Sequence, residues 1–377
     1  MSSVRVLHVV ATGSRRGAEV FASDLVRALA RAGVPQRLSV LRGTCAEVGF
    51  DAPVTMLDES EEDARASTRT ASRRRLLRLR HLAAEWSPDV VQAHGGEATK
   101  HALAALVGTR TPVIYRRIGL APPWLHRGPR RAAYAWLMRR AARVVTVGEQ
   151  VRRETAELFG VRASSIVAIP NGVDRERVGP VRGRDEIRGS LGIPPGRQML
   201  VSVGGITWEK DPLRHLRVAA RVINRRDAAH VWVGDGPMRQ ALEHQAARSG
   251  LNGRFVLLGR RTDVGDLLAA ADVLLFASRP DGMEGMPAAL IEAGMAGLPA
   301  AGFAVAGAPE VIEDGRTGLL ASSGDEEGLA GRVMELLEDD ERRRALGNAA
   351  RERCLARFEI GPISKRYLSL YDEVAGR

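Results

Sequence analysis

The chain has 377 residues, of which 45% are hydrophobic and 27% charged, and this length suits two or three domains. No uncharged apolar run approaches the roughly 18 to 20 residues that a membrane span requires, and no signal peptide pattern opens the chain, so we expect a cytoplasmic protein. Its two cysteines, Cys45 and Cys354, are too few and too distant for a disulfide framework or a cysteine metal site.

All of the excess positive charge lies in the first half of the chain. Residues 1–170 contain 27 Lys and Arg against 15 Asp and Glu, whereas residues 171–377 contain 29 against 30. A basic half beside a neutral half suits an anionic partner, such as a phosphorylated substrate or an acidic lipid surface. We expect no nucleic acid partner, because aromatic residues make up 4% of the chain and no nucleic-acid-binding motif occurs.

Short β-branched runs alternate with longer segments of helical period, which indicates βαβ units, parallel sheets and the α/β class. The strands expected in the first half are residues 4–10, 36–41, 54–57, 90–93, 113–115 and 144–147. A second set begins at 198–203 and continues at 230–233, 255–257, 273–276 and a short run that ends at 301. The sequence therefore predicts two successive domains of the same type.

The predicted boundary is the turn signal Pro170-Asn171-Gly172, which is followed by polar residues without apolar period. We expect an N-terminal domain over 1–170, a linker over 171–188 and a C-terminal domain over 189–357. Apolar residues near helical spacing in 351–374 predict a C-terminal helical region.

An arginine-rich run at 73–80 has leucines among the arginines. It fits either a basic amphipathic helix on a membrane surface or an ordinary crossover helix with a solvated face.

Two segments of the first half are candidates for ligand contacts. Gly13, Arg16 and Gly17 lie in the loop after the first expected strand. His94 ends the strand at 90–93 and is followed by Gly95-Gly96, which allows backbone to approach a ligand. Strand-end histidines also serve as packing or capping residues, so His94 alone does not establish a site.

Lys210 follows the first strand of the second domain, in the loop Gly204-Gly205-Ile206-Thr207-Trp208-Glu209-Lys210. It is one of three lysines in a chain with 56 Lys and Arg residues, and an isolated lysine suits a point charge on phosphate. The segment Gly234-x-Gly236 begins like a dinucleotide fingerprint, but Arg239 occupies the position of its third glycine. A nicotinamide dehydrogenase is therefore not expected.

The most informative segment, residues 278–293, follows the strand at 273–276 and predicts a loop and then a helix that starts at Met286 or Pro287. A helix that starts beyond a parallel strand directs free amides into the crevice where α/β ligands bind, and phosphate is the ligand we expect there. Glu284 precedes this helix and Glu292 lies about two turns into it. A bound diphosphate would repel these carboxylates, so we expect them to accept hydrogen bonds from sugar hydroxyls instead.

In combination, these motifs resemble the signature of retaining GT-B glycosyltransferases of family 4 (glycosyl transferases group 1). The resemblance rests on Glu284-x7-Glu292 within Glu-Gly-Met-Pro and Glu-Ala-Gly-Met-Ala-Gly-Leu-Pro. Further similar segments are Leu7-His8-Val9 with Gly17-Ala18-Glu19, the strand ending in His94, Ile169 to Asp174, Val233 to Pro237 and Gly315 to Leu320. The likeness covers almost the whole chain.

The resemblance implies two Rossmann-like domains that face a central cleft, with a C-terminal helix, about 358–377, that returns to the N-terminal domain. It implies a nucleoside-diphosphate sugar as donor, with a UDP-sugar slightly preferred, and no cofactor or metal. The acceptor would be a small molecule, a lipid-linked molecule or a glycan, with peripheral contact to the inner membrane face as an option. The implied catalytic residues are Glu284, His94 and Lys210, and the implied donor-binding residues are Gly13, Arg16, Gly17, Gly205, Lys210, Arg260, Arg279, Glu284, Gly285, Met286, Pro287 and Glu292.

One position departs from the family pattern. Gly205 stands where the family usually has an arginine for the diphosphate, and Arg260 or Arg279 from neighbouring loops would have to supply that charge. Three functions therefore stay open: a retaining, metal-independent transferase, a binding or partner protein of the same fold that is weakly active or inactive, and a sugar-nucleotide epimerase. For the transferase we expect attack on the same face of the sugar, because no carboxylate of the N-terminal domain recommends itself as a nucleophile.

Overall fold

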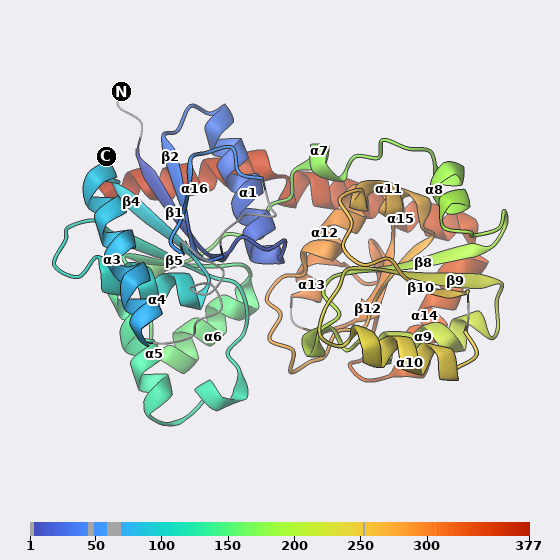
Figure 1. The fold of residues 1–377 in the computed structure, drawn as a ribbon. Coiled ribbons are helices and arrows are strands. Elements are labelled where there is room, and N and C mark those ends of the chain that lie inside the picture. Colours follow the sequence, from blue (N-terminus) through green and yellow to red (C-terminus); the bar gives the residue numbers. More distant parts are fainter. Residues whose placement is uncertain (1–3, 44–48, 59–68, 252, 306) are drawn as a thin grey trace. The chain divides into compact units, whose positions relative to one another are not determined.

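The computed structural model describes residues 4–43, 49–58, 69–251, 253–305 and 307–377, so that Cys45 lies outside the described residues. The chain divides into two compact units, one formed by Met1–Gly172 with Ile360–Arg377 and the other by Val173–Glu359. Each unit is built on its own parallel sheet with helices between successive strands (Figure 1), which confirms the predicted α/β class.

The first unit carries a seven-stranded sheet in the order β3-β2-β1-β4-β5-β6-β7, with every strand pair parallel. The strands are β1 (Val6–Thr12), β2 (Gln36–Arg42), β3 (Val54–Met56), β4 (Val90–His94), β5 (Val113–Arg117), β6 (Arg143–Thr146) and β7 (Ile166–Ala168). The helices are α1 (Gly17–Arg31), α3 (Arg69–Trp86), α4 (Gly96–Ala105), α5 (Gly128–Arg140), α6 (Glu149–Phe159) and α16 (Ile360–Ala375), with 3-10 turns η1 (Pro123–Leu125) and η2 (Ala163–Ser165).

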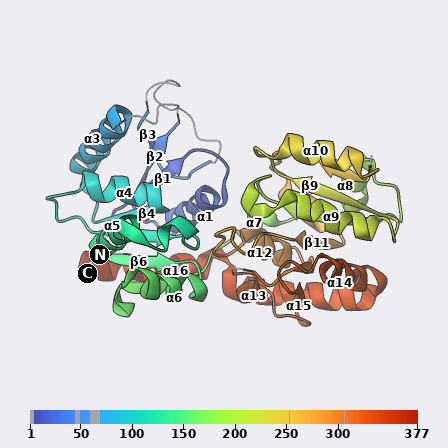
Figure 2. The same ribbon diagram turned by 90° about the horizontal axis from the view of Figure 1, so that it is seen from below.

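Helix α16 closes the core of the first unit, although it is the last helix of the chain. Its buried residues Ile363, Tyr367 and Tyr371 pack with Phe21 and Leu25 of α1 in one apolar cluster. Helix α16, red in the two ribbon views, runs across this unit (Figure 1 and Figure 2). Helices α3 and α4 pack against a separate cluster that includes residues of β1 and β4.

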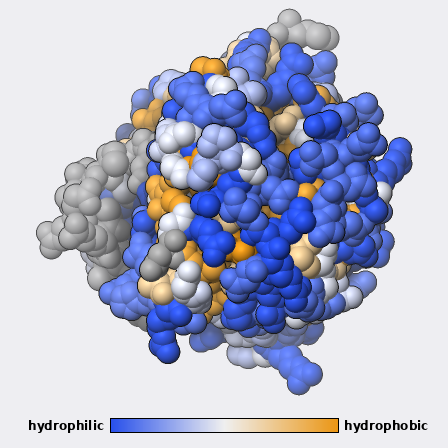
Figure 3. All heavy atoms as spheres, turned by 90° about the vertical axis from the view of Figure 1, so that its right-hand side faces the viewer, coloured by the Kyte–Doolittle hydropathy of each residue, from blue (hydrophilic) through white to orange (hydrophobic). Residues whose placement is uncertain are grey.

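The second unit carries a six-stranded parallel sheet in the order β10-β9-β8-β11-β12-β13. The strands are β8 (Gln198–Val203), β9 (Ala228–Val233), β10 (Phe255–Leu257), β11 (Val273–Phe276), β12 (Ala300–Phe303) and β13 (Gly318–Ala321). The helices are α7 (Arg175–Val178), α8 (Arg184–Ser190), α9 (Pro212–Ile223), α10 (Arg239–Arg248), α11 (Val264–Ala270), α12 (Ala288–Met295), α13 (Ala308–Val311), α14 (Glu326–Glu338) and α15 (Asp340–Phe358), with a 3-10 turn η3 (Trp208–Lys210). The face of this unit that Figure 3 turns toward the viewer is mostly hydrophilic.

The segment expected to be a linker, 171–188, is largely folded onto the second unit. Residues from Val173 onward belong to that unit and form α7 and most of α8. Arg184 and Arg188 of α8 donate to the two oxygens of Asp272 at 2.6 Å each, and the amide of Met199 donates to the same carboxylate at 2.7 Å. These bonds to a buried carboxylate hold α8, although the segment has no apolar period for a pattern to detect.

The arginine-rich run at 73–80 belongs to α3, which covers the first sheet. Arg75 is buried and pairs with Asp58 at 2.8 Å, and Arg78 donates to the carbonyl oxygen of Leu57 at 2.6 Å. Arg75 and Arg78 therefore bond within the first unit, as in a crossover helix, whereas Arg73, Arg74 and Leu77 of the same run are exposed. No helix among the described residues combines the length and the apolar character that a bilayer crossing needs.

Candidate active site

Glycine loops follow β8 and β9 and approach each other at the carboxyl edge of the second sheet. The amide of Gly204 donates to the carbonyl of Val233 at 2.9 Å, and the amide of Gly234 donates to the carbonyl of Gly259 at 2.8 Å. A Cβ atom at Gly234 would lie 1.9 Å from the carbonyl oxygen of Gly204, and the φ angle of Gly234 is +144°. The Gly234-x-Gly236 motif therefore permits close packing of two loops beside the site.

Lys210 and Glu284, which come from separate motifs, are brought together here. The Lys210 ammonium, at the end of η3, donates to Oε1 of Glu284, and the two side chains are 20% and 15% exposed. The ammonium also lies 5.6 Å from the ring centre of Phe276, at the end of β11. Oε2 of Glu284 is buried and has no partner among the described residues, so that one acceptor oxygen of this carboxylate is available.

The loop before Glu284 is held in an uncommon conformation. Met283 has a φ angle of +60°, in the left-handed region that residues with a side chain rarely adopt. A Cβ atom at Gly282 would lie 2.8 Å from the carbonyl oxygen of Glu209, so this loop rests directly on the loop that carries Lys210. Strain of this kind persists where surrounding contacts determine the conformation, and it is frequent at functional sites.

Arg279 makes contacts within these loops. Its Nε donates to Asp281 at 2.9 Å, its guanidinium lies 3.8 Å from a carboxylate oxygen of Asp211, and it stacks 4.3 Å from the ring centre of Trp208. The hydrogen bond to Asp281 raises the pKa of Arg279 further. The sequence-based assignment of Arg279 to the diphosphate therefore competes with three contacts that the residue already makes. Arg260, the other candidate, is exposed in the loop after β10.

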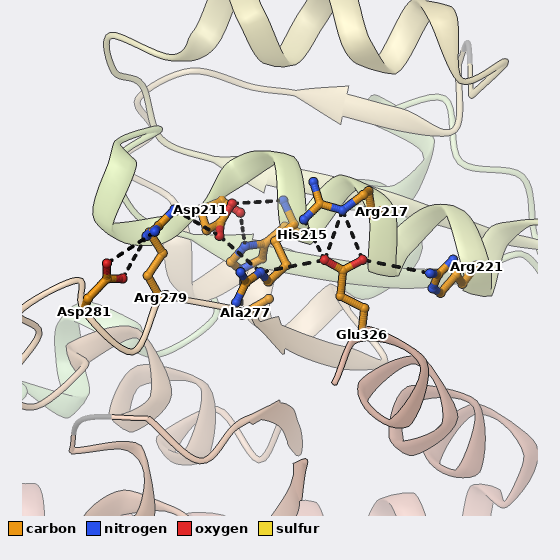
Figure 4. A network of polar contacts seen from close by, with 9 residues as sticks. Asp211, His215, Arg217, Arg221, Ala277, Arg279, Asp281 and Glu326 are labelled. Atoms are coloured by element: carbon orange, nitrogen blue, oxygen red, sulfur yellow. Dashed lines mark hydrogen bonds and ion pairs between the residues drawn. The ribbon is translucent and has the colours of Figure 1, made fainter. Parts of the chain in front are cut away.

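His215 lies between Asp211 and Ala277 and bonds to both (Figure 4). Its Nε2 accepts a hydrogen bond from the amide of Ala277 at 2.9 Å, so its Nδ1 carries the proton and donates to the carbonyl of Asp211 at 3.2 Å. Burial lowers the pKa of His215 to about 3, which keeps the ring neutral. The histidine thus fixes the residue after Lys210 against the start of the Glu284 loop.

The same network extends along α9 to α14. Arg217 donates to Glu326 at 2.6 Å and Arg221 lies 4.0 Å from that carboxylate (Figure 4). Glu326 is the first residue of α14, so its charge also faces the positive end of that helix. These contacts anchor the helix that positions His215.

Helix α12 begins at Ala288, with Pro287 as its N-cap residue, one to two residues later than the predicted start. Gly285, Met286 and Pro287 form the buried turn before it. The turn is tight, because a Cβ atom at Gly307 would lie 2.0 Å from the carbonyl oxygen of Gly285.

Glu292 lies on α12 with its side chain 9% exposed and accepts a hydrogen bond from Arg177 of α7 at 2.9 Å. Arg177 was missed because it lies in the segment that the sequence marks as a linker. This ion pair orients Glu292 within the second unit. A ligand hydroxyl at Glu292 would have to share the carboxylate with Arg177.

In the first unit, His94 is held by a chain of hydrogen bonds. Gln36 Nε2 donates to the carbonyl of Val26 at 3.0 Å, so its oxygen accepts from His8 Nε2 at 3.0 Å. His8 Nδ1 is then an acceptor and receives the proton of His94 Nε2 at 3.2 Å. His94 Nδ1 remains as a buried acceptor without a partner in the described part of the chain.

Burial keeps His8 and His94 neutral. Burial lowers the pKa of His8 to about 4, and burial, followed by the nearby His8 ring and the positive charge of Arg116, lowers the pKa of His94 well below its ordinary value. His94 therefore presents one lone pair in a defined direction. The sequence showed the strand-end position of His94 but not its partners, which lie 86 and 58 residues away in the chain.

Arg116 pairs in register with His94 on the neighbouring strand and is fully buried. Its guanidinium lies 3.6 Å from the ring centre of Phe21 and donates to Asn171 through one nitrogen. Its Nε and its other terminal nitrogen have no partner among the described residues. The carboxyl ends of β4 and β5 therefore carry the buried polar groups of His94 and Arg116.

The predicted loop residues Gly13, Arg16 and Gly17 lie between β1 and α1. Gly13 is buried, whereas Arg16 and Gly17 are exposed, and Arg16 is the extended N-cap residue of α1. No atom of the described residues lies within 4 Å of a Cβ built on Gly17, so their packing does not require glycine there. Gly205 is more confined, since a Cβ atom there would lie 3.1 Å from a methyl group of Thr207.

No group of three or more His, Cys, Asp or Glu side chains in the described ranges could hold a metal ion. The cationic groups at the site of the second unit are instead Lys210 and the arginines around it.

Two Rossmann-like units with parallel sheets, the first completed by the C-terminal helix, define the GT-B class of folds, and solved GT-B structures share this architecture. The family model "Glycosyltransferase Family 4" matches residues 15–177, and the model "Glycosyl transferases group 1" matches residues 183–353. The chain belongs to this family of glycosyltransferases, as its motifs predicted.

Two characterised relatives are similar over part of their length. N-acetyl-alpha-D-glucosaminyl L-malate synthase from Bacillus anthracis is 30% identical over 231 residues, which cover 61% of this chain and 59% of the relative. 2-deoxystreptamine glucosyltransferase from Streptomyces kanamyceticus is 30% identical over 251 residues, which cover 65% of this chain and 64% of the relative. The chain thus matches less than two thirds of the length of either relative.

A solved structure of Anabaena Alr3699/HepE in complex with UDP-glucose superposes with a TM-score of 0.84. The alignment covers 98% of this chain and 99% of that protein at 20% sequence identity. This similarity extends over both units and concerns the fold.

Proposed function

We propose that the protein transfers a sugar from a nucleoside-diphosphate donor to an acceptor, with retention at the anomeric carbon and without a metal ion. The observation that carries this proposal is the pairing of Lys210 with Glu284 at the carboxyl edge of the second sheet, with one oxygen of Glu284 unpartnered. Ligands of open α/β sheets bind at this edge. An ammonium beside a carboxylate matches a donor that has a diphosphate next to a sugar.

In this proposal Lys210 and the backbone amides at the start of α12 hold the diphosphate. A bound diphosphate competes with Glu284 for the Lys210 ammonium, and Glu284 then accepts hydrogen bonds from sugar hydroxyls. The negative charge that develops on the leaving diphosphate makes Lys210 contribute more in the transition state than in the ground state. The leaving diphosphate accepts the proton of the acceptor on the same face of the sugar.

Two further residues have supporting roles in the proposal. Glu292 accepts hydrogen bonds from the ribose hydroxyls, and Arg177 keeps its carboxylate in place. His94 offers its Nδ1 lone pair to a substrate hydroxyl, since its tautomer is set by His8 and Gln36. A neutral histidine of fixed tautomer orients a hydroxyl without adding a charge.

The substrate class is proposed from the relatives. The names of both relatives include small polar molecules, L-malate and 2-deoxystreptamine, so a small polar acceptor is the first choice. Lipid-linked molecules and glycans complete the acceptor panel. UDP-sugars are the first donors to test, followed by GDP- and ADP-sugars.

The test combines binding and transfer. We expect a UDP-sugar to raise the melting temperature of the protein and to be consumed when an acceptor is present. Glu284→Gln should lower kcat by about 10² to 10³-fold while nucleotide affinity changes little. Glu243→Gln, an exposed glutamate of α10, is the matched control and should keep full activity. Normal transfer by the Glu284→Gln variant would contradict the assigned role.

Retention and metal independence have their own measurements. The anomeric coupling constant of the product in proton NMR should show the configuration of the donor. Transfer should persist at full rate in excess EDTA. Inversion of the configuration, or loss of activity that a divalent cation restores, would refute the corresponding part of the proposal.

A second candidate is a binding protein of the same fold, and Gly205 favours it. The residue carries no charge, and its surroundings leave little room, with Thr207 at 3.1 Å from a Cβ atom built there. Stabilisation by nucleotides without transfer to any acceptor would support this candidate. Consumption of the donor without an acceptor would instead indicate an epimerase.

A further inference from the structure

The turn η1 and the helix α5 form an exposed surface on the first unit, which we call the η1–α5 surface. Trp124 of η1 is 58% exposed and Trp136 of α5 is 56% exposed. Ala135 and Met138 are the buried residues of α5, so most of this 13-residue helix faces solvent. Two tryptophans exposed to this degree on one short segment are unusual, because large apolar side chains are normally covered.

The same surface is strongly basic. No Asp or Glu occurs between Glu97 and Glu149, and five exposed arginines lie at positions 127, 130, 131, 139 and 140. Within the described ranges none of the five has a carboxylate partner. Arg139 donates to a backbone carbonyl, that of Phe159, at 3.3 Å. The positive charge of the surface is therefore not neutralised.

Arginines at the end of α9 in the second unit have carboxylate partners. There Arg217 and Arg221 of α9, and Arg225 just after its end, each have a carboxylate of Glu326 or Glu327 within 4.0 Å. A high arginine content alone accounts for many basic residues but not for five neighbours without acidic partners. The η1–α5 surface differs from this part of the second unit because its five arginines are close in sequence and have no acidic partner among the described residues.

We propose that the η1–α5 surface docks on an anionic lipid bilayer. Tryptophan rings favour the headgroup region of a membrane, where the apolar ring and the N–H group both find suitable partners. Arginines attract anionic headgroups and form bidentate bonds with phosphate. A surface helix with both residue types, about 20 Å long at 1.5 Å per residue, matches an interfacial docking element.

Two other partners fit this surface less well. The guanidinium of Arg130 lies 5.7 Å from the ring centre of Trp124, and that of Arg140 lies 5.0 Å from the ring centre of Trp136, so each indole has one face covered by a cation. Single-stranded nucleic acid requires open ring faces for base stacking. A second copy of the chain would place the same uncompensated positive charge against itself.

The test is co-sedimentation with vesicles of phosphatidylcholine alone and with 30% phosphatidylglycerol, at moderate and high salt. We expect binding to the anionic vesicles that weakens as salt is raised. The variant Arg127→Glu with Arg131→Glu removes and reverses charge at exposed positions and should lower the partition coefficient at least about tenfold, since each basic residue contributes about fivefold. Trp124→Ser with Trp136→Ser should lower it by a similar factor.

The matched control is Arg248→Glu with Arg344→Glu, two exposed arginines of the second unit that change the net charge equally. It should bind vesicles within about twofold of the unchanged protein, and thermal melting should show that all variants are folded. Equal loss in the control, or absence of binding to anionic vesicles, would overturn the proposal. Tighter binding to poly(U) than to vesicles, or a dimer that the Trp124→Ser and Trp136→Ser changes dissolve, would assign the surface to a different partner. The inference does not depend on the proposed transfer activity.

Discussion

Acid should destabilise the second unit through two histidines. Burial lowers the pKa values of His215 and His230 to about 3, from 6.5 in an unfolded chain. His230 Nε2 donates to Ser202 at 2.9 Å, and its Nδ1 is buried without a partner among the described residues. Both rings are therefore neutral in the folded protein over the usual pH range.

The sign and size of the effect follow from proton binding. Between pH 6.5 and about pH 3 the unfolded chain binds a proton at each histidine and the folded protein does not. The two histidines therefore do not reduce the free energy of unfolding above pH 6.5, and they reduce it increasingly as the pH falls toward 3. At pH 5, which is 1.5 units below the unfolded value, each histidine lowers the free energy of unfolding by about 2 kcal/mol, and the pair by about 4 kcal/mol.

The assay is urea denaturation at pH 7 and pH 5, followed by the fluorescence of the buried Trp232. His230→Gln should reduce the difference in unfolding free energy between the two pH values by about 2 kcal/mol. His244→Gln, at an exposed position of α10, should leave the difference unchanged. If the His230→Gln variant and the unchanged protein show the same pH dependence, the histidine is protonated in the folded state and the reasoning fails.

Three further perturbations have defined outcomes. Gly234→Ala should cost at least about 2 kcal/mol in urea denaturation and disturb the lysine loop. Gly250→Ala, at a position with a φ angle of +67° where no described atom lies within 4 Å of the added Cβ, should cost about 1 kcal/mol; similar costs would contradict the close approach at Gly234. Asp272→Asn should lower the free energy of unfolding by about 3 to 5 kcal/mol because two arginines lose their buried partner. Asp227→Asn, which removes the exposed ion pair with Arg197, should lower it by less than about 1 kcal/mol. Gln36→Leu should alter the nitrogen-15 imidazole signals of the neighbouring histidines in NMR at neutral pH; unchanged signals would contradict the assigned tautomers.

Much of the fold could be predicted because its strands are continuous apolar runs. The central strands β1, β4, β8 and β11 fall within a few residues of their predicted positions, since both faces of a parallel sheet are buried. Strands β7 and β13, at sheet edges, were not predicted as strands, whereas the edge strands β3 and β10 were.

The site was predictable only in part. Lys210 and Glu284 belong to separate local motifs that the sequence displays, so both could be selected before their contact was known. His215, Arg177 and His8 could not, because each acts through a partner 62 to 115 residues away. Local sequence patterns record the periodicity of an element but not which side chains a sheet brings side by side.

The return of α16 to the first unit has a consequence for biosynthesis. The first unit lacks Ile363, Tyr367 and Tyr371 from its apolar cluster until the ribosome has made the last 18 residues. At roughly 5 to 20 residues per second, translation of the intervening second unit takes on the order of 10 to 40 s. During that interval the apolar residues of the sheet and of α1 that pack against α16 stay uncovered, and a stop codon that removes α16 would leave them uncovered permanently.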